Sequence, residues 1–89
     1  MKEIVVQVAN RLGLHARAAA RFVQLASGFE SRITVSSDDS RADGKSILGL
    51  LTLAAREGTR LRLTAEGRDA DEALAQIGAL VRDRFGEAE

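Results

Sequence analysis

The sequence predicts an α+β fold, a two-layer sandwich in which three helices cover one face of a four-stranded sheet. Two observations lead to this prediction. Four short segments alternate apolar and polar residues, as half-buried strands do, and three segments repeat apolar residues at helical spacing. Their order is strand, helix, strand, strand, helix, strand, helix. Because every amphipathic element must bury its apolar face, the residues alone indicate two layers with an antiparallel or mixed sheet.

The first part of the chain predicts a strand, a turn and a helix. Residues 4–8 alternate apolar and polar side chains, and "NRLG" at 10–13 interrupts the pattern. From 16 to 27 the apolar residues recur at helical spacing among strong helix formers. The only histidine, His15, therefore lies at the N-terminus of this helix. Its buried stripe is expected to hold Ala19, Phe22, Val23 and Ala26.

The middle of the chain predicts three strands and a short helix. Strands are expected over 32–36 and 41–43, the second with the weaker pattern. Ser46 is placed to cap a short helix that ends before Gly58. Residues 60–66 then alternate cleanly, as a strand with one buried face should.

A final helix is expected after Asp69, which with Glu72 resembles a capping box. Its apolar stripe comprises Ala70, Ala73, Leu74, Ile77, Leu80 and Val81. We expect one domain over residues 1–89, with 85–89 as a frayed tail.

The composition narrows the classes of function. The chain has no cysteine, and its apolar runs are too short for a membrane span, which suits a soluble, cytoplasmic protein. Thirteen basic residues balance thirteen acidic ones, so no overall field attracts nucleic acid or an anionic membrane. Arg11, Arg17 and Arg21 nevertheless lie near His15, and no acidic residue occurs between Glu3 and Glu30.

His15 is the candidate reactive residue. A helix N-terminus carries unpaired N–H groups and the positive end of the helix dipole, which favours the neutral imidazole and its nucleophilic lone pair. If this ring attacked an activated phosphoryl group, the N–H groups of Ala16, Arg17 and Ala18 could receive the dianion. The Arg17 guanidinium could pair with its oxygens.

The alternative is a plain surface histidine, which is the usual role of a lone histidine at a helix start. The neighbouring sequence offers no carboxylate at short range for a Ser/His/Asp-type triad. One imidazole also cannot supply the three or four ligands of a zinc site, so no metal and no cofactor are expected.

Two motifs together resemble the HPr family, the histidine-containing phosphocarriers of the bacterial phosphoenolpyruvate-dependent sugar phosphotransferase system. They are "GLHARAAARFVQLAS" and "GKSILGLLTLAAREGTRLRLTAEG", and the similarity runs from about Ile4 to Val81. The resemblance implies an open-faced sandwich with an antiparallel sheet. It also implies a stoichiometric carrier, not an enzyme, that takes phosphoryl from enzyme I and passes it to IIA domains of sugar transport complexes.

The family motifs assign roles to several residues. His15 matches the phosphorylated histidine, which the family modifies at Nδ1, and Arg17 matches the arginine that assists it. Ser46 matches the serine that HPr kinase/phosphorylase modifies in some bacteria, although capping a helix is its simpler role. The expected docking residues for enzyme I and IIA are Ala20, Arg21, Ile47, Leu48 and Leu51.

One position departs from the family pattern. HPr proteins usually have proline after the arginine, and this chain has Ala18. Losing the proline loosens the backbone at Arg17 but restores one N–H donor, and these effects oppose each other for phosphate binding.

Several alternatives to a sugar-system carrier stay open. One is a regulatory HPr-like module that acts through Ser46 and protein contacts, although such relatives typically lose the histidine, and His15 is present. Others are a carrier of the nitrogen-regulatory or dihydroxyacetone type. A nucleic-acid-binding domain is disfavoured, because its strands would need exposed aromatic residues, and none of the three phenylalanines lies in an expected strand. A carrier that shows one face to successive partners is expected to be a monomer.

Overall fold

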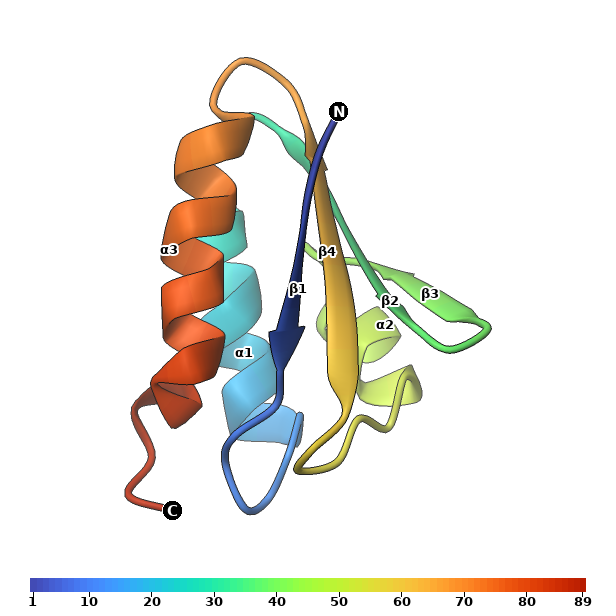
Figure 1. Cartoon of the computed structure of the whole chain (residues 1–89), viewed down its shortest axis with the longest axis vertical. Helices are drawn as coiled ribbons and strands as arrows, with labels where there is room; N and C mark the ends of the chain where they lie inside the picture. The colour runs from blue at the N-terminus through green and yellow to red at the C-terminus, as the bar shows by residue number, and fades with distance from the viewer.

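The computed structural model describes residues 1–89 and contains a four-stranded antiparallel sheet with three helices. The strand order is β1-β4-β2-β3, and the helices lie on one side of the sheet (Figure 1). The elements in chain order are β1 (Lys2–Gln7), α1 (Ala16–Ala26), β2 (Arg32–Ser37), β3 (Ser40–Asp43), α2 (Ile47–Thr52), β4 (Arg60–Glu66), α3 (Ala70–Arg82) and the 3₁₀ helix η1 (Arg84–Gly86). This order confirms the predicted fold class.

The strand register places the apolar side chains on the face that the helices cover. Ile4 pairs with Leu63 across β1 and β4, and Leu63 pairs with Val35 across β4 and β2. Leu63 and Val35 are fully buried, whereas their chain neighbours Arg62 and Ser36 lie on the opposite face. The alternation that predicts the strands is therefore the alternation between core and solvent.

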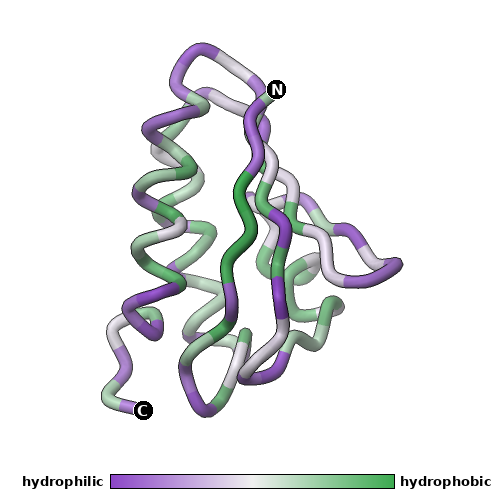
Figure 2. Tube along the Cα trace, viewed as in Figure 1, coloured by the Kyte–Doolittle hydropathy of each residue, from purple (hydrophilic) through white to green (hydrophobic).

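The buried apolar residues form one cluster between the sheet and the helices. Hydrophobic and hydrophilic segments alternate along the strands and α3 (Figure 2), as expected for elements with one buried face. Phe22 of α1 and Phe85 of η1 are the largest fully buried side chains. All predicted stripe residues of α1 and α3 belong to the cluster or pack against it.

The short helix α2 begins as predicted, with Ser46 as its N-cap. The Gly49 N–H donates a hydrogen bond to Ser46 Oγ at 3.0 Å. A Cβ at position 49 would lie 3.2 Å from Ser46 Oγ and 3.4 Å from the Ala42 side chain. Glycine is a poor helix former, but here it lets the helix start lie close to β3.

The predicted capping box at Asp69 is wrong. Asp69 precedes α3, but its side chain makes no capping hydrogen bond. The carboxylate instead accepts hydrogen bonds from the Glu30 N–H at 2.8 Å, the Ser31 N–H at 2.9 Å and Ser31 Oγ at 2.5 Å. These bonds lower the pKa of Asp69, the one from the Ser31 hydroxyl most. The carboxylate is unavailable to the helix because the fold brings the α1–β2 turn beside it.

The expected frayed tail at 85–89 is also wrong. Phe85 is fully buried, and the Arg21 guanidinium donates a hydrogen bond to its carbonyl oxygen. Further on, the Arg11 N–H donates to the Glu89 carbonyl oxygen at 2.9 Å. Burial of one aromatic ring offsets the entropy of ordering the chain end. The last residues therefore return to the loop that precedes α1.

Candidate functional site

The loop before α1 is shaped by a glycine and anchored by a leucine. Gly13 has φ of +69°, and a Cβ there would lie 2.4 Å from the Ala55 carbonyl oxygen. The next residue, Leu14, is buried and donates its N–H to the same oxygen at 2.9 Å. Because a side chain at position 13 would clash with backbone, this loop requires glycine. The following residue, His15, is thereby held at the helix start.

His15 is the N-cap residue of α1, as predicted, with extended backbone angles. Its carbonyl oxygen accepts the first helical hydrogen bond, from the Ala19 N–H at 2.8 Å. The side chain is 26% exposed and makes no capping bond. The N–H groups of Ala16, Arg17 and Ala18 therefore have no partner within the helix and form the anion-attracting end of its dipole.

A carboxylate that the sequence analysis missed lies against the imidazole. Oε2 of Glu87 is 2.5 Å from Nε2 of His15. The other carboxylate oxygen, Oε1, accepts a hydrogen bond from Nδ2 of Asn10 at 2.9 Å. His15 and Glu87 are 72 positions apart, so local sequence could not pair them. The signal was Phe85, because phenylalanine is among the residues most often buried, and its burial brings the following residues to the edge of the core.

Glu87 is held in its ionised form. Burial of the carboxyl raises its pKa, but the hydrogen bonds from Asn10 and His15 outweigh burial. The charges of His15 and Arg21 act in the same direction, and the pKa of Glu87 lies below its ordinary value. A carboxylate in this position accepts a hydrogen bond from Nε2–H of the ring.

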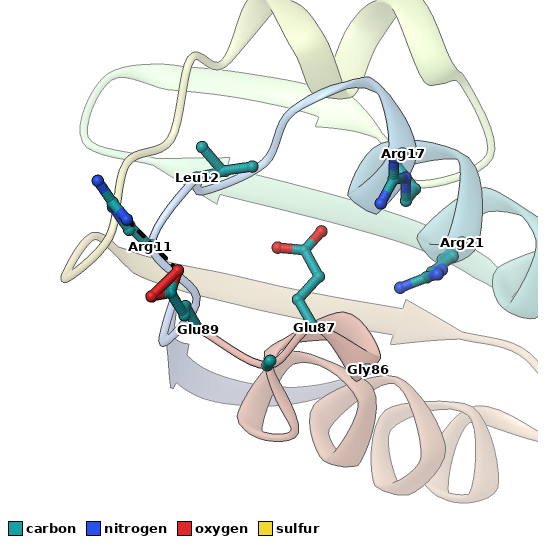
Figure 3. A pocket seen from close by; sticks show the side chains of 8 residues that line it. Arg11, Leu12, Arg17, Arg21, Gly86, Glu87 and Glu89 are labelled. Carbon is teal, nitrogen blue, oxygen red and sulfur yellow. Dashed lines mark hydrogen bonds and ion pairs between the residues drawn. The ribbon is translucent and has the colours of Figure 1, made fainter.

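Arginines surround the carboxylate. A pocket beside it is lined by Arg11 and Leu12 of the first loop, by Arg17 and Arg21 of α1, and by residues 86–89 (Figure 3). Arg11 pairs with Glu89 at 3.3 Å, and Arg21 is bonded to the Phe85 carbonyl. Arg17 makes neither an ion pair nor a hydrogen bond. Of the three arginines that line this pocket, Arg17 is the one whose guanidinium is free to bind an anion.

The expected docking residues differ in exposure. Leu48 is 76% exposed and Ile47 is 43% exposed, whereas Leu51 is half-buried and packs partly against the core. Ala20 and Arg21 are exposed on α1, which contacts α2. Leu12 is 67% exposed in the loop before His15, and the sequence analysis did not identify it. Its signal was an apolar residue within the turn "NRLG".

Two classes of site have no support in the geometry. No group of three or more histidine, cysteine, aspartate or glutamate residues is placed to hold a metal ion. No helix combines the length and apolar character that a membrane span requires.

Comparisons with known proteins extend over nearly the whole chain. Residues 2–83 match the family model described as "PTS HPr component phosphorylation site". Phosphocarrier protein HPr of Neisseria meningitidis is 46% identical over 84 residues, 94% of each chain. Phosphocarrier protein NPr of Shewanella violacea is 46% identical over 83 residues, 93% of this chain and 91% of the relative.

Two solved structures share the fold. HPr-C-His from Thermoanaerobacter tengcongensis has a TM-score of 0.95 at 43% identity and covers 100% of both chains. The catabolite repression protein Crh of Bacillus subtilis, described as a swapped dimer, has a TM-score of 0.76 at 40% identity, covering 94% of this chain and 97% of that one.

Proposed function

Because the chain belongs to the HPr family of phosphocarrier proteins, we propose that it carries a phosphoryl group on His15 from one protein to another. One observation supports this role above the others. The imidazole stands at a helix N-terminus, and the Glu87 carboxylate that contacts it lines the same pocket as the unpaired guanidinium of Arg17, so an added dianion would be stabilised there. A plain surface histidine would need neither neighbour.

The proposed mechanism uses the Nδ1 lone pair. Nε2 is engaged by Glu87, and Nδ1 makes no hydrogen bond with the protein. Attack by Nδ1 on phosphorus would place the phosphoryl oxygens near the free N–H groups of residues 16–18, with Arg17 pairing to them. The group is later handed to an acceptor, so the chain acts stoichiometrically and has no turnover of its own.

The proposed partners are enzyme I as donor and IIA domains of sugar transport complexes as acceptors, which places the chain in the cytoplasm. We assign their docking surface to Ala20 and Arg21 of α1 with Ile47, Leu48 and Leu51 of α2. Exposed aliphatic residues beside a reactive group suit a short-lived protein contact. A monomer would leave this surface open, whereas a swapped dimer is described for the relative Crh.

A nitrogen-type relay is the second candidate, and a specific observation favours retaining it. The NPr relative is as similar to this chain as the HPr relative, at 46% identity in both cases. A carrier for dihydroxyacetone phosphorylation would share the same site. These versions differ in the donor and the acceptor and not in the chemistry at His15.

Regulation at Ser46 is a separate proposal. Its hydroxyl oxygen caps α2, and a phosphate there would still face unpaired N–H groups at the helix start. The expected result with an HPr kinase and ATP is a mass increase of one phosphoryl group that Ser46→Ala abolishes. No increase with a kinase active on its own substrate would reject regulation at this residue.

The first test is intact mass spectrometry after incubation with phosphoenolpyruvate, Mg²⁺ and enzyme I of either the sugar or the nitrogen type. The expected result is one acid-labile phosphoryl group, absent in His15→Ala, because only the histidine offers a nucleophilic ring nitrogen. The faster of the two donors identifies the relay. No addition with either active donor would reject the carrier function.

A further inference from the structure

We propose that Asn10 and Glu87 are positioning residues for the His15 ring. The Asn10 amide holds the Glu87 carboxylate against Nε2, so that the ring proton stays on Nε2 and the lone pair stays on Nδ1. This inference deepens the proposed function and rests on it. It gives a role to Asn10 and Glu87, which lie outside both the motif around His15 and the motif around Ser46.

The side-chain amide of Asn10 uses both of its N–H hydrogens as donors. It is fully buried, and Nδ2 donates to the Gly13 carbonyl oxygen at 2.8 Å and to Glu87 Oε1 at 2.9 Å. Its own Oδ1 is buried with no hydrogen-bond partner. Rotating the amide would turn that oxygen toward two other oxygens, so the contacts allow one orientation only. An unsatisfied buried oxygen costs free energy, and both donated bonds converge on the surroundings of His15.

The position of Glu87 is also built into the fold. Arg84 and Phe85 both have left-handed backbone angles, with φ of 58° and 55°, which aromatic and long side chains rarely adopt. The buried Phe85 ring and the bond from Arg21 to its carbonyl maintain this turn. Strained backbone that its surroundings enforce is often found at functional sites. The turn delivers the Glu87 side chain to the imidazole.

The arrangement has a defined consequence for transfer. The Nδ1 lone pair forms the new N–P bond, while the old bond from phosphorus to the donor breaks and the donor keeps its electron pair. The Nε2 proton stays in place, so the phosphorylated ring carries a positive charge that the Glu87 carboxylate balances. When the group moves on, the N–P electron pair returns to Nδ1. No proton has to leave or enter the ring in either step.

Replacing one carboxylate oxygen of Glu87 by an amide nitrogen tests the inference. In Glu87→Gln, Asn10 would still donate to the side-chain oxygen, and the new amide NH₂ would face Nε2 as a donor. We expect the ring proton to move from Nε2 to Nδ1, removing the attacking lone pair. The readout is the pair of ¹⁵N shifts of the His15 ring in the unphosphorylated protein, recorded at a pH where the ring is neutral.

The matched control is Glu30→Gln. This carboxylate pairs with Arg68 and lies outside the pocket beside Glu87, so its loss should leave the ring shifts and the transfer rate unchanged. Asn10→Ala removes the hydrogen bond that holds Glu87 in place but keeps the carboxylate, and we expect a mixture of both ring tautomers. Urea unfolding of each variant checks that the domain is still folded, and the amide shifts of residues 10–14 and 84–89 check that the loop and the last residues keep their structure.

Transfer from phosphorylated enzyme I is measured on the same samples. We expect Glu87→Gln to slow the transfer about tenfold or more, because the wrong tautomer cannot attack. Unchanged ring shifts in Glu87→Gln would overturn the positioning role, even if the wild type is phosphorylated. Failure of the wild type to accept phosphoryl, with the proton shift present, would instead reject the proposed function and leave the tautomer control intact.

Discussion

Asp69 lies just before α3 and Glu87 lies beyond the other end of that helix (Figure 1), and the two carboxylates have different partners. Asp69 accepts three hydrogen bonds from Glu30 and Ser31 of the neighbouring turn, and these residues belong to no candidate site. Glu87 accepts one bond from the buried Asn10 and one from His15, whose ring is the proposed phosphoryl acceptor. A carboxylate with only structural partners closes a turn. The carboxylate bonded to the His15 ring, by contrast, has the proposed role of orienting that ring for phosphoryl transfer.

The largest expected effect comes from removing the anchor of the Glu87 end. Phe85→Ala should lower the free energy of unfolding by about 3–5 kcal/mol, because a fully buried aromatic ring is lost. It should also release Glu87 from His15. Urea denaturation measures the loss. Phe29→Ala is the control at the Asp69 end, where the ring is only half-buried, and an equal loss in both variants would show that Phe85 is no special anchor.

The Asp69 end is expected to respond to acid. Its pKa lies below the ordinary value in the folded protein, so the ionised group stabilises the fold above about pH 3.9, the unfolded pKa of aspartate. This stabilisation is lost as the pH falls through the lowered folded pKa. Asp69→Asn should therefore be less stable near neutral pH and should show a flatter acid dependence. Thermal unfolding from pH 2 to pH 7 tests this, with the exposed Asp39→Asn as control; identical acid profiles would contradict it.

A smaller loss of stability is expected at the start of α2, where the Ser46 hydroxyl caps the helix. Ser46→Ala should cost about 1 kcal/mol, because the Gly49 N–H loses its acceptor. The corresponding change at the start of α1, His15→Ala, should cost less, since the His15 side chain does not cap its helix. Chemical denaturation of both variants makes the comparison, and a larger loss for His15→Ala would reverse it.

The smallest effect on folding is expected from Leu48→Glu. Leu48 is 76% exposed, so unfolding should change by no more than about 0.5 kcal/mol. Exchange of phosphoryl with enzyme I should nevertheless slow, because a charge enters the proposed docking surface. The control is Val5→Glu, another exposed apolar position, on the sheet face that the helices leave open. Equal exchange rates in both variants would remove Leu48 from the docking surface.

Sequence reasoning captured the parts of the molecule that depend on local patterns. Alternation gave all four strands, and the spacing of Phe22 with its neighbours gave the buried face of α1. The position of His15 at a helix start and the cap at Ser46 followed from residue types next to one another. These features rest on periodicity and backbone chemistry within one turn.

What escaped prediction depends on pairing across the chain. Asp69 has the sequence context of a helix cap, yet tertiary contact with Ser31 outcompetes the helix N–H groups for its oxygens. Glu87 lies in a short acidic stretch that is typical of a solvated end, and only the burial of Phe85 brings it to His15. The residue type of a carboxylate does not by itself tell whether its side chain meets a distant donor or water.

The return of the chain end to the site has a consequence for how the protein is handled. Anything attached after Glu89, such as an affinity tag or a fluorophore, would begin beside Arg11 and within reach of the pocket around Glu87. The first residue lies at the other end of the molecule (Figure 1). A label at the N-terminus would lie away from the proposed site, whereas the same label at the C-terminus would lie beside it.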